Sequence, residues 1–394
     1  MRVGVTLLVV LLLVCSSLCV VTTRNQYILV DGQPFFMTGA TYSIIPTGKI
    51  PDSAPDSAAN TTYGRGIWMR DINNMKAIGG NTLRVYSMES ADHTAFYDYA
   101  YANGIKLIVS MWVTYQNFSD PTIRSNLLSS WTAFVKKERH PAILMWCFGN
   151  ELNIGGNGDG PLFNIMKDVR NVVQTYDTPN PRPVTTTFAD RDLSSTISTF
   201  YSQSSGFDVF SFQIYRGNTF YNLFKDFNAT VKLQKPLLIT EFGCDAFDNN
   251  NNREDQTQHA NWNMKLWNEI YSNSAICAGG LSFNYADEWW RCDKTRPSVH
   301  KNCGNTASAS FDNYWNEEWS GLYSVAPNPT SGGPDILTPR SIVTNLTKLW
   351  SNSPYPKDIL TTIPPKPTPT SSSSYITCNS MLLVMLMIVW FMAM

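Results

Sequence analysis

The sequence predicts an α/β protein that forms a single eight-stranded (β/α) TIM barrel with elaborated loops. Eight short apolar, β-rich runs lie between residues 27 and 350, and helix-like stretches separate them, as in a parallel sheet built from βα units. Eight such units in one continuous stretch suit a closed barrel. A doubly wound open sheet remains an alternative, although no glycine-rich phosphate fingerprint follows the first run.

The predicted strands are apolar on both faces, as buried parallel strands are. They cover residues 35–42, 82–86, 106–113, 143–150, 184–188, 209–215, 237–242 and 280–285. The clearest predicted helices between and after them cover residues 66–78, 94–103, 123–137, 163–176 and 256–272. We assign residues 24–350 to this one domain, because no linker-like composition interrupts it.

Both ends of the chain have the composition of processing signals. Residues 1–19 combine a basic start, an apolar run and small residues, which indicates a secretory signal peptide, with a signal anchor as the weaker alternative. Residues 351–374 are rich in Pro, Thr and Ser and predict a stalk. Residues 375–394 end in an uncharged apolar tail and predict a GPI-attachment propeptide rather than a spanning helix. We therefore expect a secreted, cell-surface protein that a lipid anchor holds on the outer leaflet of the plasma membrane, with the cell wall as the alternative location.

Charge and cysteine content exclude several classes of partner. The chain has 31 acidic and 30 basic side chains and a formal net charge of −1, which argues against a nucleic-acid partner. No CxxC or HExxH motif occurs and the histidines are scattered, so we expect no metal and no cofactor. Cys147 lies in an apolar run and is expected to be buried, whereas Cys292 and Cys303 bracket a loop and could pair. No protein partner can be inferred.

Two glutamates stand where strands of the predicted barrel end. Glu151 follows the fourth run, and Glu241 lies near the end of the seventh. The fourth and seventh strands face each other across a barrel, so the two carboxyl groups could flank one glycosidic bond as an acid and a second carboxylate. The plainer alternative is that one or both are loop carboxylates that merely follow a strand.

The motifs around these glutamates resemble those of a known clan of retaining glycoside hydrolases. The pair Asn150-Glu151 and the later Glu241 resemble the acid/base and nucleophile of that (β/α)₈-barrel clan. Residues 70–72, 80–86 and 104–105, together with both terminal signals, resemble the fungal GPI-anchored β-1,3-glucanosyltransferases. Residues 140–143 running into 149–151 resemble the β-galactosidase and β-glucuronidase family equally well. Residues 291–316 depart from the glucanosyltransferase pattern.

The resemblance implies roles for individual residues. Glu151 would protonate the leaving oxygen and Glu241 would attack the anomeric carbon. Asn150 would bind the sugar 2-hydroxyl, and Arg84 would keep the nucleophile ionised, unless Arg84 is an exposed residue paired with Asp71. Tyr215 would orient Glu241, unless it is a core tyrosine.

Aromatic residues at strand ends are candidates for sugar contacts. Trp112 follows the third predicted strand, and Trp289 and Trp290 follow the eighth. Indole rings stack well on sugar faces, although at least one of the tryptophan pair is expected to be buried. Four further carboxylates are interpreted as a solvated loop face in preference to subsite contacts, namely Asp287, Glu288, Glu317 and Glu318.

Three functions are compatible with this pattern. The first is a retaining β-glycosidase or transglycosidase that acts on cell-surface or cell-wall β-glucan, with β-1,3-glucan favoured, so that the expected partner is a polysaccharide or oligosaccharide substrate. The second is an exo-acting hydrolase like β-galactosidases, β-glucuronidases or mannanases. The third is a non-catalytic carbohydrate-binding surface protein, for which a missing glutamate would be the sign. Both glutamates are present.

Overall fold

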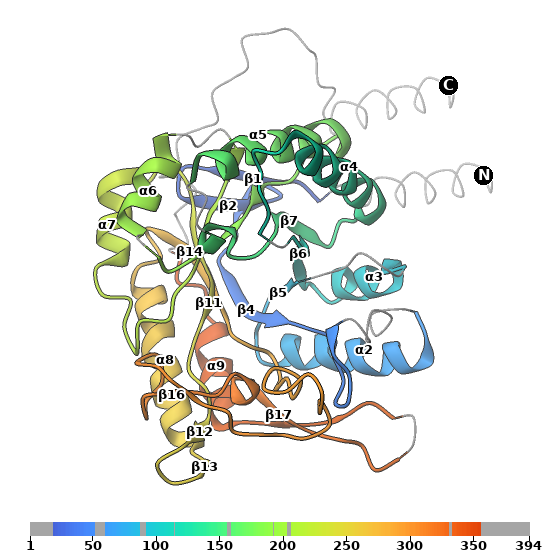
Figure 1. The fold of residues 1–394 in the computed structure, drawn as a ribbon, viewed down its shortest axis with the longest axis vertical. Helices are drawn as coiled ribbons and strands as arrows, with labels where there is room; N and C mark the ends of the chain where they lie inside the picture. Colours follow the sequence, from blue (N-terminus) through green and yellow to red (C-terminus); the bar gives the residue numbers. More distant parts are fainter. Residues whose placement is uncertain are drawn as a thin grey trace, which may run out of the picture. The chain divides into compact units, whose positions relative to one another are not determined.

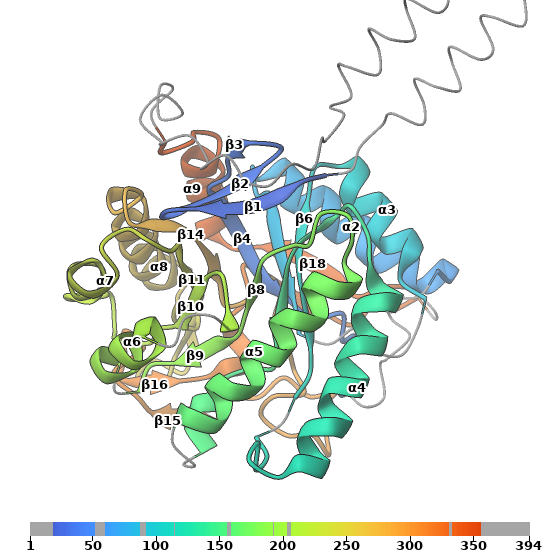
Figure 2. The same cartoon turned by 90° about the horizontal axis from the view of Figure 1, so that it is seen from above.

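The computed structural model describes residues 19–51, 60–86, 92–113, 115–155, 159–191, 193–202, 206–330 and 333–355. The predicted signal peptide lies outside the described residues except for Cys19, and the predicted stalk does so beyond Tyr355. The predicted GPI propeptide lies wholly outside them. Within the described ranges, the fold is an α/β barrel whose helices surround a parallel sheet (Figures 1 and 2).

The central sheet is nearly closed, and each pair of adjacent strands in it is parallel. Its order is β8-β7-β6-β5-β4-β14-β11-β10-β9. The strands are β4 (Met37–Tyr42), β5 (Thr82–Val85), β6 (Lys106–Met111), β7 (Ile143–Phe148), β8 (Val184–Thr185), β9 (Thr187–Ala189), β10 (Phe210–Gln213), β11 (Leu237–Phe242) and β14 (Cys277–Ser282). The expected barrel architecture is thus present.

The sheet contains nine strand segments, so the prediction of eight uninterrupted strands is not confirmed. The predicted fifth strand, residues 184–188, is divided at Thr186. Its first part pairs only with β7 and its second part only with β10. The two ends of the sheet therefore meet at one residue, and the Oγ1 hydroxyl of Thr186 donates to the carbonyl of Phe148 across this seam (2.8 Å).

Eight described helices lie around the sheet. They are α2 (Thr62–Ala77), α3 (Thr94–Ala102), α4 (Pro121–Glu138), α5 (Asp159–Tyr176), α6 (Leu193–Ser202), α7 (Leu223–Val231), α8 (Gln256–Ser272) and α9 (Ser341–Trp350). Local signals fix several starts: the side chains of Thr61, Asp120 and Asp255 each accept hydrogen bonds from backbone N–H groups of the first turn. Proline at the first position of α4 needs no hydrogen-bond partner there.

The apolar core has two parts. The larger part lies between sheet and helices and contains outward-facing strand residues such as Leu83 and Phe212. The smaller part fills the barrel with residues such as Ile108 and Leu238. It continues into Val21 and Ile28 of β1 (Val21–Arg24) and β2 (Tyr27–Val30), which with β3 (Gln33–Pro34) form a small antiparallel sheet. This sheet lies across one end of the barrel (Figure 2), where β4 begins, so it closes the amino ends of the strands.

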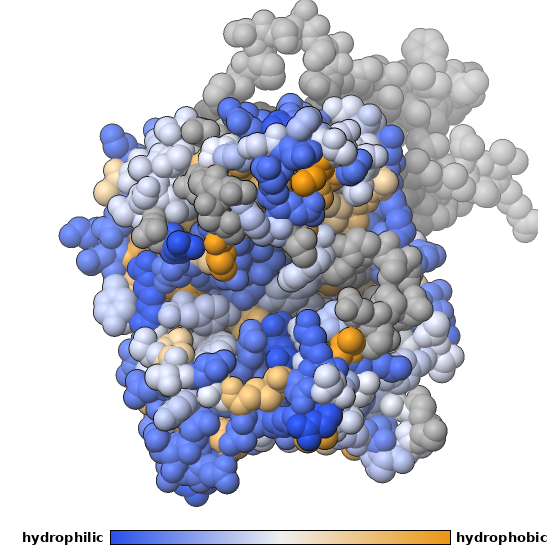
Figure 3. Space-filling view, viewed as in Figure 1, coloured by the Kyte–Doolittle hydropathy of each residue, from blue (hydrophilic) through white to orange (hydrophobic). Residues whose placement is uncertain are grey.

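The surface in Figure 3 is largely hydrophilic, with hydrophobic side chains scattered singly. Trp112 and Ile154, each 50% exposed, are among the most exposed large hydrophobic residues that the structure describes. A search of the described helices finds none with the length and hydropathy that a membrane span needs.

Five short elements follow the barrel strands and lie near their carboxyl ends. They are β15 (Asn305–Thr306), β16 (Tyr314–Trp315), the 3₁₀ helix η5 (Glu317–Trp319) and the hairpin of β17 (Tyr323–Ala326) with β18 (Ile336–Pro339). A disulfide joins Cys292 to Cys303 in the loop before them, as expected. Cys147 is buried, also as expected.

Candidate active site

Glu241 reaches the inside of the barrel because β11 is irregular at Thr240. Strict alternation from Leu238, which faces the barrel interior, would direct Glu241 outward. The pairing register with β10 shifts between Phe212 and Gln213, so that Ile239 pairs with Phe212 but Glu241 pairs with Gln213. An extra residue of this kind re-aims the side chains that follow it and is common beside active sites. The local break in β11 thus brings Glu241 into a polar layer above the apolar barrel core.

One oxygen of Glu241 accepts three hydrogen bonds. Arg84 Nη1 lies 2.6 Å from Oε1 and the Tyr86 hydroxyl 2.7 Å from it, and Gln213 Nε2 also donates to it. Arg84 is fully buried, and its pKa is raised by the adjacent Glu241 carboxylate in spite of an opposing effect of burial. A buried guanidinium next to hydrogen-bond donors stabilises the ionised carboxylate. The alternative of an exposed Arg84 paired with Asp71 is wrong, because Asp71 pairs with Arg70.

The second oxygen of Glu241 has a single described donor. The Tyr215 hydroxyl lies 3.1 Å from Oε2. Burial, followed by the negative charge of Glu241, raises the pKa of Tyr215 well above its usual value, so this hydroxyl remains a donor. Since Oε1 is already held by three groups, Oε2 is the oxygen with room for a reacting carbon.

A tight turn after β7 presents Asn150 and Glu151. Gly149 and Glu151 have φ values of +72° and +51°, a conformation that a glycine adopts freely and a glutamate adopts at a cost. A Cβ atom at Gly149 would lie 2.6 Å from the Leu152 side chain. The backbone N–H of Glu151 donates to the Thr187 carbonyl (3.0 Å), which holds the turn against β9.

Asn150 is oriented by three donors at its Oδ1 atom. Arg84 Nη2 lies at 2.6 Å, Gln213 Nε2 at 2.8 Å and the Thr187 hydroxyl at 3.2 Å. Arg84 and Gln213 therefore each bridge Asn150 and Glu241. With its oxygen held in this way, the amide directs its NH₂ group to the other side, where it can donate to a ligand.

Glu151 lies in a different environment from Glu241. Its pKa is raised to about 7, first by burial and then by the negative charge of Glu241, against an opposing effect of Arg84. The charge of Glu317 contributes in the same direction. A carboxyl group with such a pKa is protonated at mildly acidic pH and can act as a proton donor and then as a base.

The three predicted tryptophans have different surroundings. Trp112 directly follows β6 and is half exposed. Trp290 packs on the Arg291 guanidinium, with 4.7 Å between the guanidinium carbon and the ring centre. Trp289 stacks on His300 at 4.8 Å, and His300 in turn stacks on Trp319 at 3.7 Å. Trp289 is therefore part of a stacked cluster within the loop.

The interpretation of the four later carboxylates as a solvated face is wrong for three of them. Asp287 is buried in an ion pair with Arg340 at 2.7 Å. Glu288 is buried and pairs with Arg291. Glu318 is buried and accepts from the backbone N–H groups of Cys292 and Lys301. Only Glu317 is substantially exposed, and it too contacts Arg291.

Sequence reasoning did not identify three polar residues of the site as contact residues: Tyr86, Thr187 and Gln213. Each lies on the inner face of a strand or just beyond its carboxyl end. Tyr86 is two positions after Arg84, and Gln213 is two positions before Tyr215. Period-two alternation from the predicted residues could have found both.

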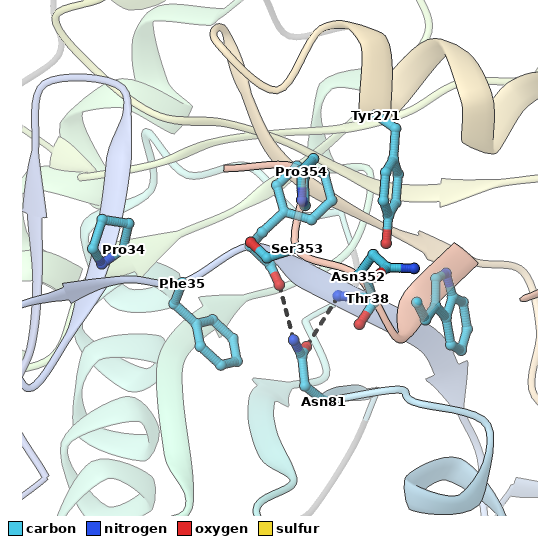
Figure 4. A pocket seen from close by; sticks show the side chains of 10 residues that line it. Pro34, Phe35, Thr38, Asn81, Tyr271, Asn352, Ser353 and Pro354 are labelled. Carbon is cyan, nitrogen blue, oxygen red and sulfur yellow. Dashed lines mark hydrogen bonds between the residues drawn. The ribbon is translucent and has the colours of Figure 1, made fainter. Parts of the chain in front are cut away.

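A cavity in the structure lies at the other end of the barrel (Figure 4). It is lined in part by Phe36, Thr38 and Asn81, where β4 and β5 begin. Asn81 is held there by hydrogen bonds from its Nδ2 to the Phe36 carbonyl and from the Thr38 N–H to its Oδ1. Barrel enzymes place their chemistry at the carboxyl ends, so this cavity is separate from the site around Glu241. In the described part of the chain, no cluster of three or more His, Cys, Asp or Glu side chains could hold a metal ion.

The sequence and the fold were compared with those of known proteins. A family model described as glucanosyltransferase, within the glycoside hydrolases, matches residues 14–317. No curated protein matches the sequence.

Several solved structures share the fold. A β-glucuronidase from Ruminococcus gnavus in complex with D-glucuronic acid is 16% identical with a TM-score of 0.60, over 84% of this chain and 52% of that one. A GH2 β-galacturonidase from Eisenbergiella tayi is 14% identical with a TM-score of 0.57, over 86% and 55%. ScGas2 in complex with a compound is 18% identical with a TM-score of 0.56, over 84% and 69%. This chain thus spans about half the length of the two bacterial enzymes.

Proposed function

The chain belongs to the glucanosyltransferase family of glycoside hydrolases, and from this premise we propose that it cleaves and rejoins β-1,3-glucan chains of a cell surface or cell wall. With β8 and β9 taken as two halves of one strand, the barrel has the eight strand positions of a TIM barrel. The observation that carries the proposal is the pair of glutamates at the carboxyl ends of β7 and β11, one surrounded by donors and the other with a raised pKa.

In the first step, Glu241 Oε2 attacks the anomeric carbon while Glu151 gives its proton to the leaving glycosidic oxygen. The carbon–oxygen bond to the leaving chain breaks and an ester bond to Glu241 forms. The three donors at Oε1 fix the plane of the carboxylate, and the Asn150 amide is placed to donate to the sugar 2-hydroxyl.

In the second step, Glu151 is ionised and takes the proton of an acceptor hydroxyl. The acceptor oxygen bonds to the anomeric carbon, and Glu241 leaves as a carboxylate. Two inversions give net retention. When the acceptor is a glucan hydroxyl the reaction is a transfer, and when it is water the reaction is a hydrolysis.

Product analysis tests this function. The secreted ectodomain, residues 24–365, is incubated with reduced laminari-oligosaccharides, and products are separated by chromatography and identified by mass. Longer and shorter oligosaccharides together would support transfer, and shorter products alone would support hydrolysis. Failure to change any member of a wider panel of β-glycans, including β-galactosides, β-glucuronides and β-mannans, would contradict an enzymatic function and favour a binding protein.

The same proposal includes a cell-surface location with a lipid anchor. It is supported by the signal-like composition of both ends and by the Cys292–Cys303 disulfide, which suits an oxidising compartment. Phosphatidylinositol-specific phospholipase C should release the protein from intact cells. A protein that resists this treatment but dissolves in detergent would contradict the GPI anchor.

A further inference from the structure

The hairpin formed by β15 and β16 places a tryptophan beside Tyr215, which contacts the proposed nucleophile. The ring centre of Trp315 lies 5.1 Å from that of Tyr215, nearly edge to face, and 6.3 Å from that of Phe283. Tyr215 is the residue whose hydroxyl contacts Glu241 Oε2. Trp315 is only half-buried, although it is a large aromatic side chain one ring away from the reacting oxygen.

Two residues later in the chain, Glu317 offers a carboxylate on the same side of the barrel. Its side chain keeps 43% of its surface exposed, while Arg291 Nη1 contacts it at 3.2 Å. Burial and its acidic neighbours raise the pKa of Glu317 against the opposing effect of Arg291, and Glu241 is among those neighbours. Glu317 is partly exposed and takes no part in the proposed bond changes, and its charge also affects the pKa of Glu151. Its carboxylate therefore has acceptor positions available to a ligand.

Arg291 holds Glu317 in place while part of the Glu317 side chain stays exposed. The guanidinium lies over the rings of Phe283 at 4.8 Å and Trp290 at 4.7 Å, and it also pairs with Glu288. Its side chain is 15% exposed. A guanidinium fixed by two rings and a buried carboxylate presents its remaining donor in one direction, so Arg291 is a positioning residue for Glu317.

We propose that Trp315 and Glu317 form a sugar subsite next to the bond that reacts. A β-linked hexopyranose unit would place the C–H face of its ring on the indole of Trp315 and donate hydroxyl hydrogen bonds to the carboxylate of Glu317. Aromatic stacking and charge-assisted hydrogen bonds are the two interactions that recognise a neutral sugar. The inference rests on the proposed function and adds to it the residues that hold the glucan chain beside Glu241.

Binding measured without turnover tests this subsite. In a Glu151→Gln background, titration calorimetry with reduced laminarihexaose gives a dissociation constant for each further variant. Trp315→Ala is expected to raise it about tenfold and Glu317→Gln about fivefold. Trp315→Phe should recover part of the loss, because it keeps an aromatic face.

Tyr314→Ala is the matched control. Tyr314 precedes Trp315 in the same short strand, so its side chain points to the opposite face of the hairpin. This variant should change the dissociation constant less than twofold, which separates loss of the subsite from loss of the hairpin. Thermal unfolding of each variant shows whether the fold is kept. If Trp315→Ala is unstable, the dissociation constant of Trp315→Phe is compared with that of Tyr314→Ala instead.

The outcomes separate this inference from the proposed function. In one outcome the Glu151→Gln protein binds laminarihexaose, and the dissociation constants of the Trp315 and Glu317 variants equal that of Tyr314→Ala. This result would overturn the subsite and leave the proposed function intact. If the Glu151→Gln protein binds none of the β-glucans and the wild type acts on none, the proposed function fails and the subsite fails with it.

Discussion

The carboxyl ends of β7 and β11 each present a glutamate, but they surround it differently. Around Glu241, Arg84, Tyr86, Gln213 and Tyr215 all donate hydrogen bonds. None of the side chains that the structure describes donates a hydrogen bond to the carboxyl group of Glu151. Burial, followed by the charge of Glu241, raises the pKa of Glu151 to about 7. Donors stabilise a charged carboxylate, whereas desolvation stabilises a neutral carboxyl group. The same residue type thus has surroundings that suit a charged carboxylate at one strand end and a neutral carboxyl group at the other, as the proposed roles of nucleophile and acid require.

The largest expected effect comes from removing the proposed nucleophile, Glu241. Glu241→Gln should lower the transfer rate by a factor on the order of 10⁴, because an amide cannot form the ester intermediate. Its oxygen can still accept from Arg84, so the fold should be kept. The rate is measured by chromatography of laminari-oligosaccharide products.

A matched variant separates chemistry from stability at the same position. Both variants leave Arg84 buried without an anion, but only Glu241→Ala also removes the hydrogen-bond acceptor. Glu241→Ala should therefore cost more in the free energy of unfolding than Glu241→Gln, about 3–5 kcal/mol. Equal stability of the Ala and Gln variants in urea would contradict the proposed role of the buried pair.

The next largest effect is expected from removing the proposed acid, Glu151. Glu151→Gln should lower the transfer rate by about 10²–10⁴ with little change in stability, because its carboxyl group is not part of the network around Glu241. An aryl β-glucoside with a good leaving group needs less protonation, so its first step should suffer less. An equal loss with both substrates would argue against Glu151 as the acid.

A smaller effect is expected from pH. Since the pKa of Glu151 is raised to about 7, kcat/KM for glucan cleavage should fall as pH rises through 7, by about tenfold per unit at higher pH. Between pH 4.5 and 7 the native state holds this proton and the unfolded state does not. The contribution of Glu151 to the free energy of unfolding therefore falls as pH rises from 4.5 to 7. A wild-type profile without this alkaline limb would contradict the assignment, and the residual activity of Glu151→Gln should lack it.

The smallest effect should come from the single donor at Oε2. Tyr215→Phe removes one hydrogen bond of about 1 kcal/mol and should lower kcat about fivefold, while KM changes little. Gln213→Leu is a useful comparison, because Gln213 contacts both Glu241 and Asn150 and its loss should affect kcat more. If Tyr215→Phe instead raised KM alone, Tyr215 would be a binding residue only.

The apolar runs of the sequence were enough to predict the barrel, and they placed Glu151 and Glu241 at the ends of two strands. Apolar runs such as 237–242 are readable because both faces of a parallel strand are buried. The irregularity at Thr240 was not readable, since it arises from pairing with Phe212 and Gln213 on another strand. Alternation alone would have directed Glu241 to the wrong face.

A long-range ion pair explains the error at Asp287. Asp287 was expected in a solvated loop, yet it is buried because Arg340, 53 positions later, neutralises it. Nothing in the local sequence around Asp287 indicates that partner. The Cys292–Cys303 pair was predictable because its two members bracket one short loop.

The seam at Thr186 has a consequence for how the site tolerates change. Contacts that join the segment after β7 to β9 across the seam include the N–H of Glu151, which donates to the Thr187 carbonyl, and Asn150, which accepts from the Thr187 hydroxyl. The turn that carries the proposed proton donor thus also joins the two ends of the sheet where its hydrogen-bond ladder is interrupted. Substitutions that weaken these hydrogen bonds are expected to change the distance between the two glutamates before the protein unfolds. Activity should therefore be lost at a smaller structural change than the one that unfolds the barrel.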